Sequence, residues 1–184
     1  MALTPSNMLA LGTKAPYFEL PDSISAKTLT INDFASETAT VLMFICNHCP
    51  YVIHVNPEIA RIAQDYQLRG IQFVAISSND TEGHPEDAPD KMKALALAEG
   101  FSFPYLYDET QAVAKAYDAA CTPDFYIFDH EMKLVYRGRI DNSRPNSGIP
   151  LSGKDIRTVL DNLLEKKPTS PVQFPSMGCN IKWK

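Results

Sequence analysis

Two cysteines, Cys46 and Cys49, stand three positions apart in the sequence Cys-Asn-His-Cys-Pro. Thiols at this spacing can close into a small disulfide ring and reopen without a large movement of the backbone. A lone C-x-x-C pair beside a strand–helix–strand pattern is typical of redox chemistry, and the chain has only four cysteines. We therefore predict that Cys46 and Cys49 are redox-active.

The pair lies where a predicted buried strand, residues 40–45, meets a predicted helix, residues 51–68. At such a turn the unpaired N–H groups and the positive end of the helix dipole favour a thiolate. Because proline favours the first helical position and keeps the residue before it extended, we expect Cys49 to be the N-cap and Pro50 to begin the helix. Our hypothesis is that Cys49 is the nucleophile and Cys46 its resolving partner.

His48 lies inside the dithiol ring. An imidazolium there would stabilise a thiolate and make the disulfide more oxidising. The alternative is an exposed loop histidine without a role. We include His48 among the predicted catalytic residues, whereas His84 and His130 fall in predicted loops and receive no role.

A metal site is an alternative use for the two thiols. Zinc in a structural site takes four ligands, and the sequence has no second C-x-x-C motif to complete the set. Copper bound by Cys46, Cys49 and His54 is a further alternative, but we expect His54 on the exposed side of the helix. The remaining alternative is that both thiols are buried and inert. We predict no metal and no organic cofactor.

Composition narrows the class of protein. The 184 residues are 45% hydrophobic and 21% charged, which is ordinary for one globular domain. A net charge of −5 argues against nucleic acid or anionic membrane as a partner. No apolar run approaches the about 20 residues of a membrane span, and no secretion signal is visible. We expect a cytoplasmic protein with neither nucleic-acid nor membrane partners.

The predicted elements alternate between strands and helices within a single domain, residues 1–184. An arm (about 1–15) leads to a hairpin of 17–20 and 28–31, and an irregular tail (about 167–184) ends the chain. Strands 40–45, 71–76 and 103–107 alternate with helices 51–68, 89–99 and 108–119, the last opened by a capping box of Asp108 and Gln111. A second hairpin, 125–128 and 134–140, precedes a helix that Ser152 caps. This order predicts one mixed sheet with helices on both faces.

Four segments, residues 44–51, 121–125, 136–141 and 178–184, together resemble the thioredoxin-like superfamily and, within it, the peroxiredoxin-like AhpC/TSA-type redoxins. The resemblance implies an α/β thioredoxin-like fold, a central mixed β-sheet flanked by helices with an N-terminal β-hairpin extension. It implies that Thr122-Pro123 is a cis-proline turn opposite the active cysteine. The backbone before this proline would pair with an extended substrate chain. Pro57, eight positions after Cys49, matches the kinking proline of thioredoxins and supports Cys49 as the nucleophile.

The sequence also departs from these relatives. Peroxiredoxins have Thr or Ser three residues before their reactive cysteine, where this chain has Cys46, and an arginine in the region that here contains Cys121, Thr122 and Pro123. Both groups would orient a peroxide. Thioredoxins have a buried acid in the strand before the cysteines, but residues 40–45 contain no carboxylate. Proton transfer to the leaving thiol therefore needs another group.

We predict a thiol–disulfide oxidoreductase that cycles between the Cys46/Cys49 dithiol and disulfide. Its partners would be a disulfide- or peroxide-containing substrate and a dithiol electron donor such as a thioredoxin-type reductant. The alternatives are a thiol peroxidase with Cys49 peroxidatic, and a non-enzymatic metal-binding or redox-sensing module. Cys121 and Cys179 are possible accessory thiols. Ile181 and Trp183 predict that the tail folds back onto the domain and brings Cys179 with it.

Overall fold

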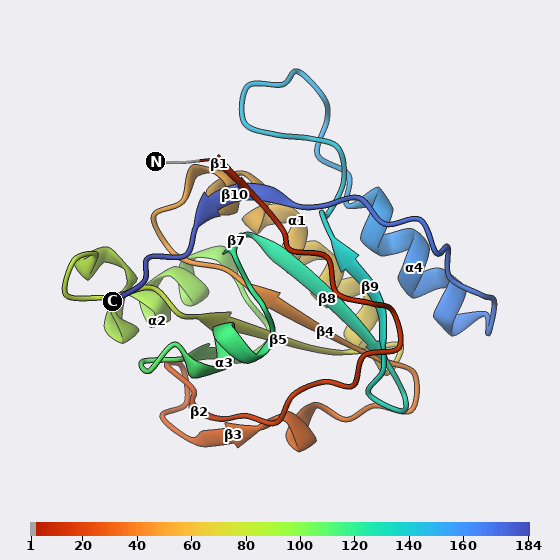
Figure 1. Ribbon diagram of the computed structural model, residues 1–184, viewed down its shortest axis with the longest axis horizontal. Coiled ribbons are helices and arrows are strands. Elements are labelled where there is room, and N and C mark those ends of the chain that lie inside the picture. The colour runs from red at the N-terminus through yellow and green to blue at the C-terminus, as the bar shows by residue number, and fades with distance from the viewer. Residues whose placement is uncertain (1–2) are drawn as a thin grey trace.

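A computed structural model describes residues 3–184 and is built around a five-stranded mixed sheet of order β6-β5-β4-β8-β9 (Figure 1). Strand β4 pairs in parallel with β5 and antiparallel with β8. Strand β5 is parallel to β6, and β9 is antiparallel to β8. The strands are β4 (Ala39–Phe44), β5 (Gln72–Ser77), β6 (Tyr105–Tyr107), β8 (Asp124–Asp129) and β9 (Leu134–Gly138).

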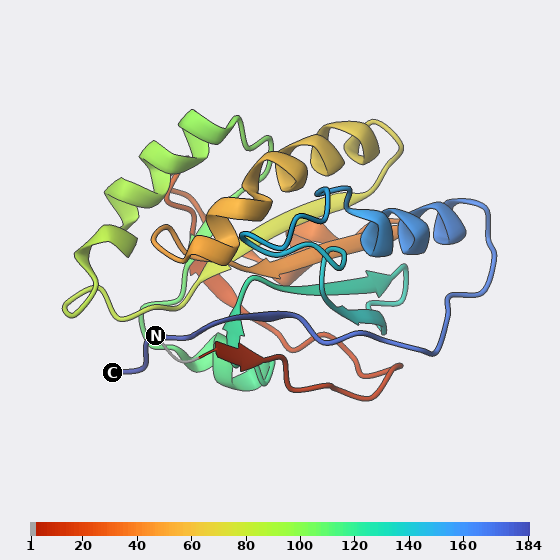
Figure 2. The same ribbon diagram turned by 90° about the horizontal axis from the view of Figure 1, so that it is seen from above.

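Apolar side chains on both faces of β4 build two cores, which explains the unbroken apolar run in its sequence. Val41 and Met43 point to one face, where they join side chains of α1 (Pro50–Gln67), α2 (Pro89–Glu99) and α4 (Lys154–Leu164). Leu42 and Phe44 point to the other face, toward α3 (Ala112–Ala116). Figure 2 shows the three longer helices on one side of the sheet and α3 on the other. The predicted central mixed sheet flanked by helices is confirmed.

The predicted N-terminal hairpin is also confirmed. It consists of β2 (Glu19–Pro21) and β3 (Thr28–Thr30), which pair antiparallel as a separate two-stranded sheet. A short 3-10 helix, η1 (Ile31–Phe34), follows directly. Leu20 of the hairpin and Phe34 of η1 are buried in the core on the α3 side of the central sheet. The hairpin thus covers part of the face that the single short helix leaves open.

The two ends of the chain meet in a third sheet, which the sequence did not predict. Strand β10 (Met177–Asn180) lies between β1 (Leu3–Pro5) and β7 (Cys121–Thr122), antiparallel to both. The expectation of one sheet and an irregular tail was therefore wrong. Gly178 permits this pairing, because a Cβ there would overlap the carbonyl of Thr122. The predicted docking of the tail is confirmed for Ile181, which is buried in the core, whereas Trp183, on which the prediction also rested, is 43% exposed.

Two predicted helix caps are wrong. Helix α3 follows Gln111 in a left-handed conformation (φ 61°), and the carboxylate of Asp108 accepts hydrogen bonds from Ala114 N and Ser78 Oγ. Helix α4 begins after Gly153 rather than Ser152. In both cases the acceptor for the first turn lies several positions before the helix: Ala114 N of α3 donates to Asp108, and Asp155 N and Ile156 N of α4 donate to the carbonyl of Ile140. Asp141 accepts from the backbone N–H groups of Ser152 and Gly153, just before α4, at 2.7 Å each.

Among the described residues, no helix combines the length and the apolar character that crossing a membrane requires.

Candidate active site

The strand-to-helix turn between β4 and α1 positions the two cysteines as the sequence predicts. Cys49 is the N-cap of α1, with extended backbone angles (φ −71°, ψ 122°), and Pro50 is the first helical residue. Cys46 lies just beyond the end of β4. Both are almost completely buried, with 0% of Cys49 and 1% of Cys46 exposed. Helix α1 continues through Pro57 without a break.

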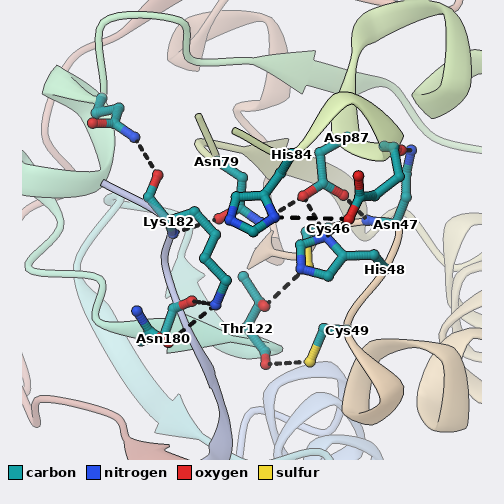
Figure 3. A network of polar contacts seen from close by, with 12 residues as sticks. Cys46, Asn47, His48, Cys49, Asn79, His84, Asp87, Thr122, Asn180 and Lys182 are labelled. Carbon is teal, nitrogen blue, oxygen red and sulfur yellow. Dashed lines mark hydrogen bonds and ion pairs between the residues drawn. The ribbon is translucent and has the colours of Figure 1, made fainter. Parts of the chain in front are cut away.

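Thr122 faces both thiols across the turn (Figure 3). Cys49 Sγ lies 3.4 Å from the Thr122 carbonyl oxygen, and Cys46 Sγ lies 3.3 Å from Thr122 Oγ1. The Thr122-Pro123 peptide bond is cis, as the resemblance implied. The structure therefore brings together four of the predicted site residues: the two cysteines, Thr122 and Pro123.

The two thiols of the turn differ in acidity. Hydrogen bonding from the Cys46 thiol, with a further contribution from the Cys179 thiol, lowers the pKa of Cys49 to about 5 against the opposing effect of burial. The N–H of Val52, which also bonds to the Cys49 carbonyl, contributes less. The pKa of Cys46 is raised well above its usual value by its hydrogen bond to Cys49, by burial and by the charge of Asp87. Cys49 is the thiolate of the pair and Cys46 the thiol.

His48 is held by a buried carboxylate. Its Nδ1 lies 2.7 Å from Asp87 Oδ2, and the side chain of Asp87 is completely buried. Asp87 also accepts hydrogen bonds from Asn47 N and Asn79 Nδ2, both at 2.7 Å. These bonds satisfy the carboxylate and fix the loop that carries His48 (Figure 3).

Sequence reasoning missed Asp87. It ends the short 3-10 helix η2 (Pro85–Asp87), within a stretch that looked like an ordinary polar loop. A usable signal existed, because β4 and β5 are parallel and residues after their carboxyl ends must meet at one edge of the sheet. The buried acid that is missing from β4 thus comes from the loop after β5.

His84 was also missed. Its ring stacks on that of His48 with 5.0 Å between centroids and 5° between planes. Glu86 Oε1 lies 3.7 Å from Nδ1 of each histidine. We assigned no role to His84, but its ring contacts that of His48. No local pattern indicates this contact, because the two histidines are 36 positions apart in the sequence.

These side chains include possible metal ligands. Ligand atoms of Cys46, His48 and Asp87 lie within 4.8 Å of one another, and so do those of His48, His84 and Glu86. Zinc accepts such sulfur, nitrogen and oxygen donors. However, the ring of His48 already bonds to Asp87, and parallel stacked imidazoles do not direct their nitrogens at one point. The hydrogen-bond network therefore describes these residues better than a preformed metal site, and the absence of a metal stays a prediction.

His54 departs from its expected position. It is half-buried rather than on the exposed side of α1, and its Nε2 lies 3.0 Å from Ser143 Oγ. This bond holds the ring against the loop before α4. His54 thus bonds to Ser143 and belongs to neither of the two groups of possible metal ligands.

The two accessory thiols differ in their surroundings. Cys121 is buried in β7, and burial raises the pKa of its thiol. Cys179 lies in β10 directly opposite Thr122, and burial together with a hydrogen bond to Cys49 raises its pKa to about 12. The structure brings Cys179 to the active turn, as the tail prediction allowed.

Comparison with known proteins gives a family and a fold. A model of the AhpC/TSA family matches residues 11–137. The chain is 58% identical to an uncharacterized conserved protein from Geobacillus kaustophilus, with a TM-score of 0.99 over 100% of this chain and 97% of that one. It is 44% identical to a protein from Sinorhizobium meliloti 1021, with a TM-score of 0.96 over 98% of both chains.

A more distant similarity identifies the fold alone. The thioredoxin domain of a thiol-disulfide oxidoreductase from Bacteroides vulgatus is 17% identical, with a TM-score of 0.66 over 85% of this chain and 99% of that one. The prediction of a thioredoxin-like fold is confirmed. No curated protein matches the chain.

Proposed function

The chain belongs to the AhpC/TSA family, and from that premise we propose that it is a thiol–disulfide oxidoreductase with Cys49 as nucleophile and Cys46 as resolving thiol. The observation that carries this proposal is the difference in acidity between two thiols in contact. Cys49 has a pKa of about 5, whereas that of Cys46 is raised well above its usual value. At neutral pH one sulfur is therefore ready to attack and the other holds a proton.

The reaction proceeds in two exchanges. The Cys49 thiolate attacks one sulfur of a substrate disulfide, forms a mixed disulfide and releases the other sulfur as a thiolate. Cys46 then attacks Cys49, releases the second substrate thiol and closes the Cys46–Cys49 disulfide. Two electrons pass from the protein to the substrate, and a dithiol donor returns them. No organic cofactor takes part.

His48 and Asp87 are the proposed groups for proton transfer at Cys46. Cys46 must lose its proton to attack, and the charge of Asp87 opposes the thiolate. The side chains of Cys46, His48 and Asp87 have polar atoms within 4.8 Å of one another, and His48 is held in place by the 2.7 Å bond to Asp87. An imidazole so placed can accept the proton while its other nitrogen stays bonded to the carboxylate. This pair would replace the buried acid that β4 lacks.

Substrate binding is assigned to Thr122 and Pro123. The Thr122 carbonyl lies 3.4 Å from Cys49 Sγ, so a chain that pairs with this backbone would bring its disulfide to the nucleophile. We propose a protein or peptide disulfide as substrate and a thioredoxin-type dithiol as electron donor. A cytoplasmic location, which we expect from the sequence analysis, would supply such a donor.

Trapping of the mixed disulfide tests the assignment. With an insulin-like disulfide and a dithiol donor, the wild-type protein and a Cys121→Ser control should turn over, whereas Cys49→Ser and the double variant Cys46→Ser/Cys179→Ser, which lacks both thiols near Cys49, should not. The double variant should accumulate a covalent adduct at Cys49, and Cys49→Ser should not accumulate one at Cys46. The opposite pattern of adducts would reverse the two roles.

Peroxide reduction is the second candidate, and the AhpC/TSA match is the observation that favours it. The Cys49 thiolate would attack the peroxide and become a sulfenic acid, and the peroxide would release water or an alcohol as the leaving group. Cys46 would then attack the sulfenic acid, form the Cys46–Cys49 disulfide and release water. Two site features weigh against it. Cys46 replaces the hydroxyl residue that would orient a peroxide, and the region of Cys121, Thr122 and Pro123, where peroxiredoxins have an arginine, contains none. Peroxide and disulfide tested on the same preparation, with the same donor, separate the two activities.

A further inference from the structure

The C-terminal strand covers the edge of β7 at the active turn. Cys179 of β10 is directly opposite Thr122, and Asn180 is opposite Cys121. Without β10 the edge of this short strand would be unpaired, and an extended peptide could add to it by backbone hydrogen bonds. The chain therefore places a segment of its own, with a cysteine in it, where an extended substrate would lie.

Several bonds hold this segment in place. Lys182 N donates to Asn79 Oδ1 at 2.9 Å, and Ile181 N donates to Ala120 O at 3.1 Å. The side chain of Gln111 donates to Lys182 O at 2.7 Å. Figure 3 shows Asn180 and Lys182 beside Thr122 and Asn79. The position of Cys179 is thus defined by the bonds of the residues that follow it and by its pairing with Leu3 of β1 and Thr122 of β7.

Cys179 contacts the proposed nucleophile. Cys179 pairs with Thr122, whose carbonyl oxygen lies 3.4 Å from Cys49 Sγ, and the thiol and backbone N–H of Cys179, like the Cys46 thiol, lower the pKa of Cys49. All three residues belong to one buried cluster, and Cys179 is only 4% exposed. Cys49 therefore has two thiols within reach, one on its own turn and one on the C-terminal strand.

We propose that Cys179 is a second resolving thiol, which attacks a mixed disulfide at Cys49 and closes a Cys49–Cys179 bond between α1 and β10. This inference rests on the proposed function. The Cys179–Cys49 bond forms and the bond from Cys49 to the substrate sulfur breaks. The proton of Cys179 passes to the leaving substrate thiolate. The protein loses two electrons, and the two sulfurs of the original substrate disulfide gain them.

The state of Cys49 affects the acidity of Cys179. Burial is the main reason that the pKa of Cys179 is raised to about 12, and while Cys49 is a thiolate the hydrogen bond to it and its negative charge contribute as well. In the mixed disulfide Cys49 has no charge, so this contribution disappears and only burial opposes ionisation. Cys179 therefore acts as a hydrogen-bond donor in the reduced protein and becomes a better nucleophile after the first exchange.

Peptide mapping tests the proposal on the full chain. Cys46→Ser is treated with one equivalent of glutathione disulfide, and disulfide-linked peptides are identified by mass spectrometry without reduction. We expect the Cys49–Cys179 link in most molecules, both in this variant and in the matched control Cys46→Ser/Cys121→Ser. In Cys46→Ser/Cys179→Ser the glutathione adduct at Cys49 should persist at least tenfold longer. Cys46→Ser/Cys179→Ala repeats this test with a second side chain, and thermal unfolding verifies that each variant is folded.

The outcomes distinguish a failure of the role proposed for Cys179 from a failure of the proposed function. If Cys49 takes up glutathione but its adduct has the same lifetime with and without Cys179, Cys179 has no resolving role and the proposed function stands. If Cys49 takes up no glutathione in any folded variant, both the proposed function and the role of Cys179 are wrong.

Discussion

The imidazole of His48 lies flat against that of His84, with 5.0 Å between centroids and 5° between ring planes. Only His48 also bonds to the buried carboxylate of Asp87. The stack limits rotation of the His48 ring, and the carboxylate sets which nitrogen carries the proton. A loop that follows β5 thereby controls the orientation of a side chain on the turn after β4.

Replacement of His48 should make the Cys46–Cys49 disulfide less oxidising. His48→Ala removes the side chain that bonds to the Asp87 carboxylate and leaves that charge beside Cys46 without this partner, which destabilises the thiolate form of the pair. We expect a fall in reduction potential of about 30 mV, equivalent to about 1.4 kcal/mol. A redox titration against a glutathione buffer measures it. His54→Ala is the matched control, since that histidine bonds to Ser143. An unchanged or more oxidising pair in His48→Ala would contradict the role.

The alkylation rate of Cys49 should report its low pKa. Because the pKa is lowered to about 5, the thiolate is present above that pH, and the rate with iodoacetamide should be nearly constant from pH 6 to pH 8 and fall by half near pH 5. An ordinary cysteine, with a pKa of about 8.5, would instead gain rate through this range. Peptide mapping assigns the modified residue. A profile for Cys49 that rises only above pH 8 would exclude the thiolate assignment.

The buried ion pair of Asp124 and Arg137 should dominate the stability of the sheet edge near the cis-proline. Both side chains are 0% exposed, and Arg137 Nε and Nη1 have no hydrogen-bond partner among the described residues. Asp124→Ala leaves a buried unpaired charge and should lower the free energy of unfolding by about 3–5 kcal/mol. Urea denaturation measures the change.

Asp155→Ala is the control for that prediction. It breaks the Arg139–Asp155 pair, in which 27% and 22% of the two side chains are exposed, and should cost about 0–1 kcal/mol. Equal losses in the two variants would show that burial of the Asp124–Arg137 pair has no special effect.

Local sequence patterns were enough to predict the parts of the site that depend on the nearest residues. The apolar run of β4, the proline after Cys49 and the 3.6-residue period of α1 place the two cysteines at a helix N-terminus, as the structure shows. The Thr122-Pro123 turn required the resemblance, because nothing in its own residues selects a cis bond.

The parts that were missed depend on long-range pairing. Asp87 and His84 reach the turn only because β5 lies beside β4 in parallel. Strand β10 has too little periodicity to be recognised, since its Gly178 and Cys179 take their extended form from β1 and β7 on either side. Likewise, the N–H groups of Asp155 and Ile156 that begin α4 donate to the carbonyl of Ile140, across a long loop, whereas a search for a local cap finds only Ser152.

The C-terminal segment should control access to Cys49, which is fully buried beneath the active turn. Gln111 is the main side chain that holds the last residues. It donates to Ser78 O and Lys182 O, and its Oε1 accepts from Lys184 N at 3.0 Å. Gln111→Ala removes these bonds, each with a net value of about 1 kcal/mol. If Cys49 reacts when this segment opens, its alkylation rate should rise about five- to thirty-fold, which corresponds to about one to two kcal/mol.

The matched control for this prediction is Gln67→Ala. Gln67 makes a comparable pair of bonds, to the carbonyl and hydroxyl of Ser102 at the far end of α1. Its removal should leave the alkylation rate of Cys49 unchanged, although both variants lose a similar number of hydrogen bonds. Equal rates for Gln111→Ala and the wild-type protein would show that reagents reach Cys49 by a route that does not involve the C-terminal segment. Equal acceleration in both variants would indicate that Cys49 reacts after global unfolding. A local opening of the C-terminal segment would depend on the bond at Lys182 and not on the bond at Ser102.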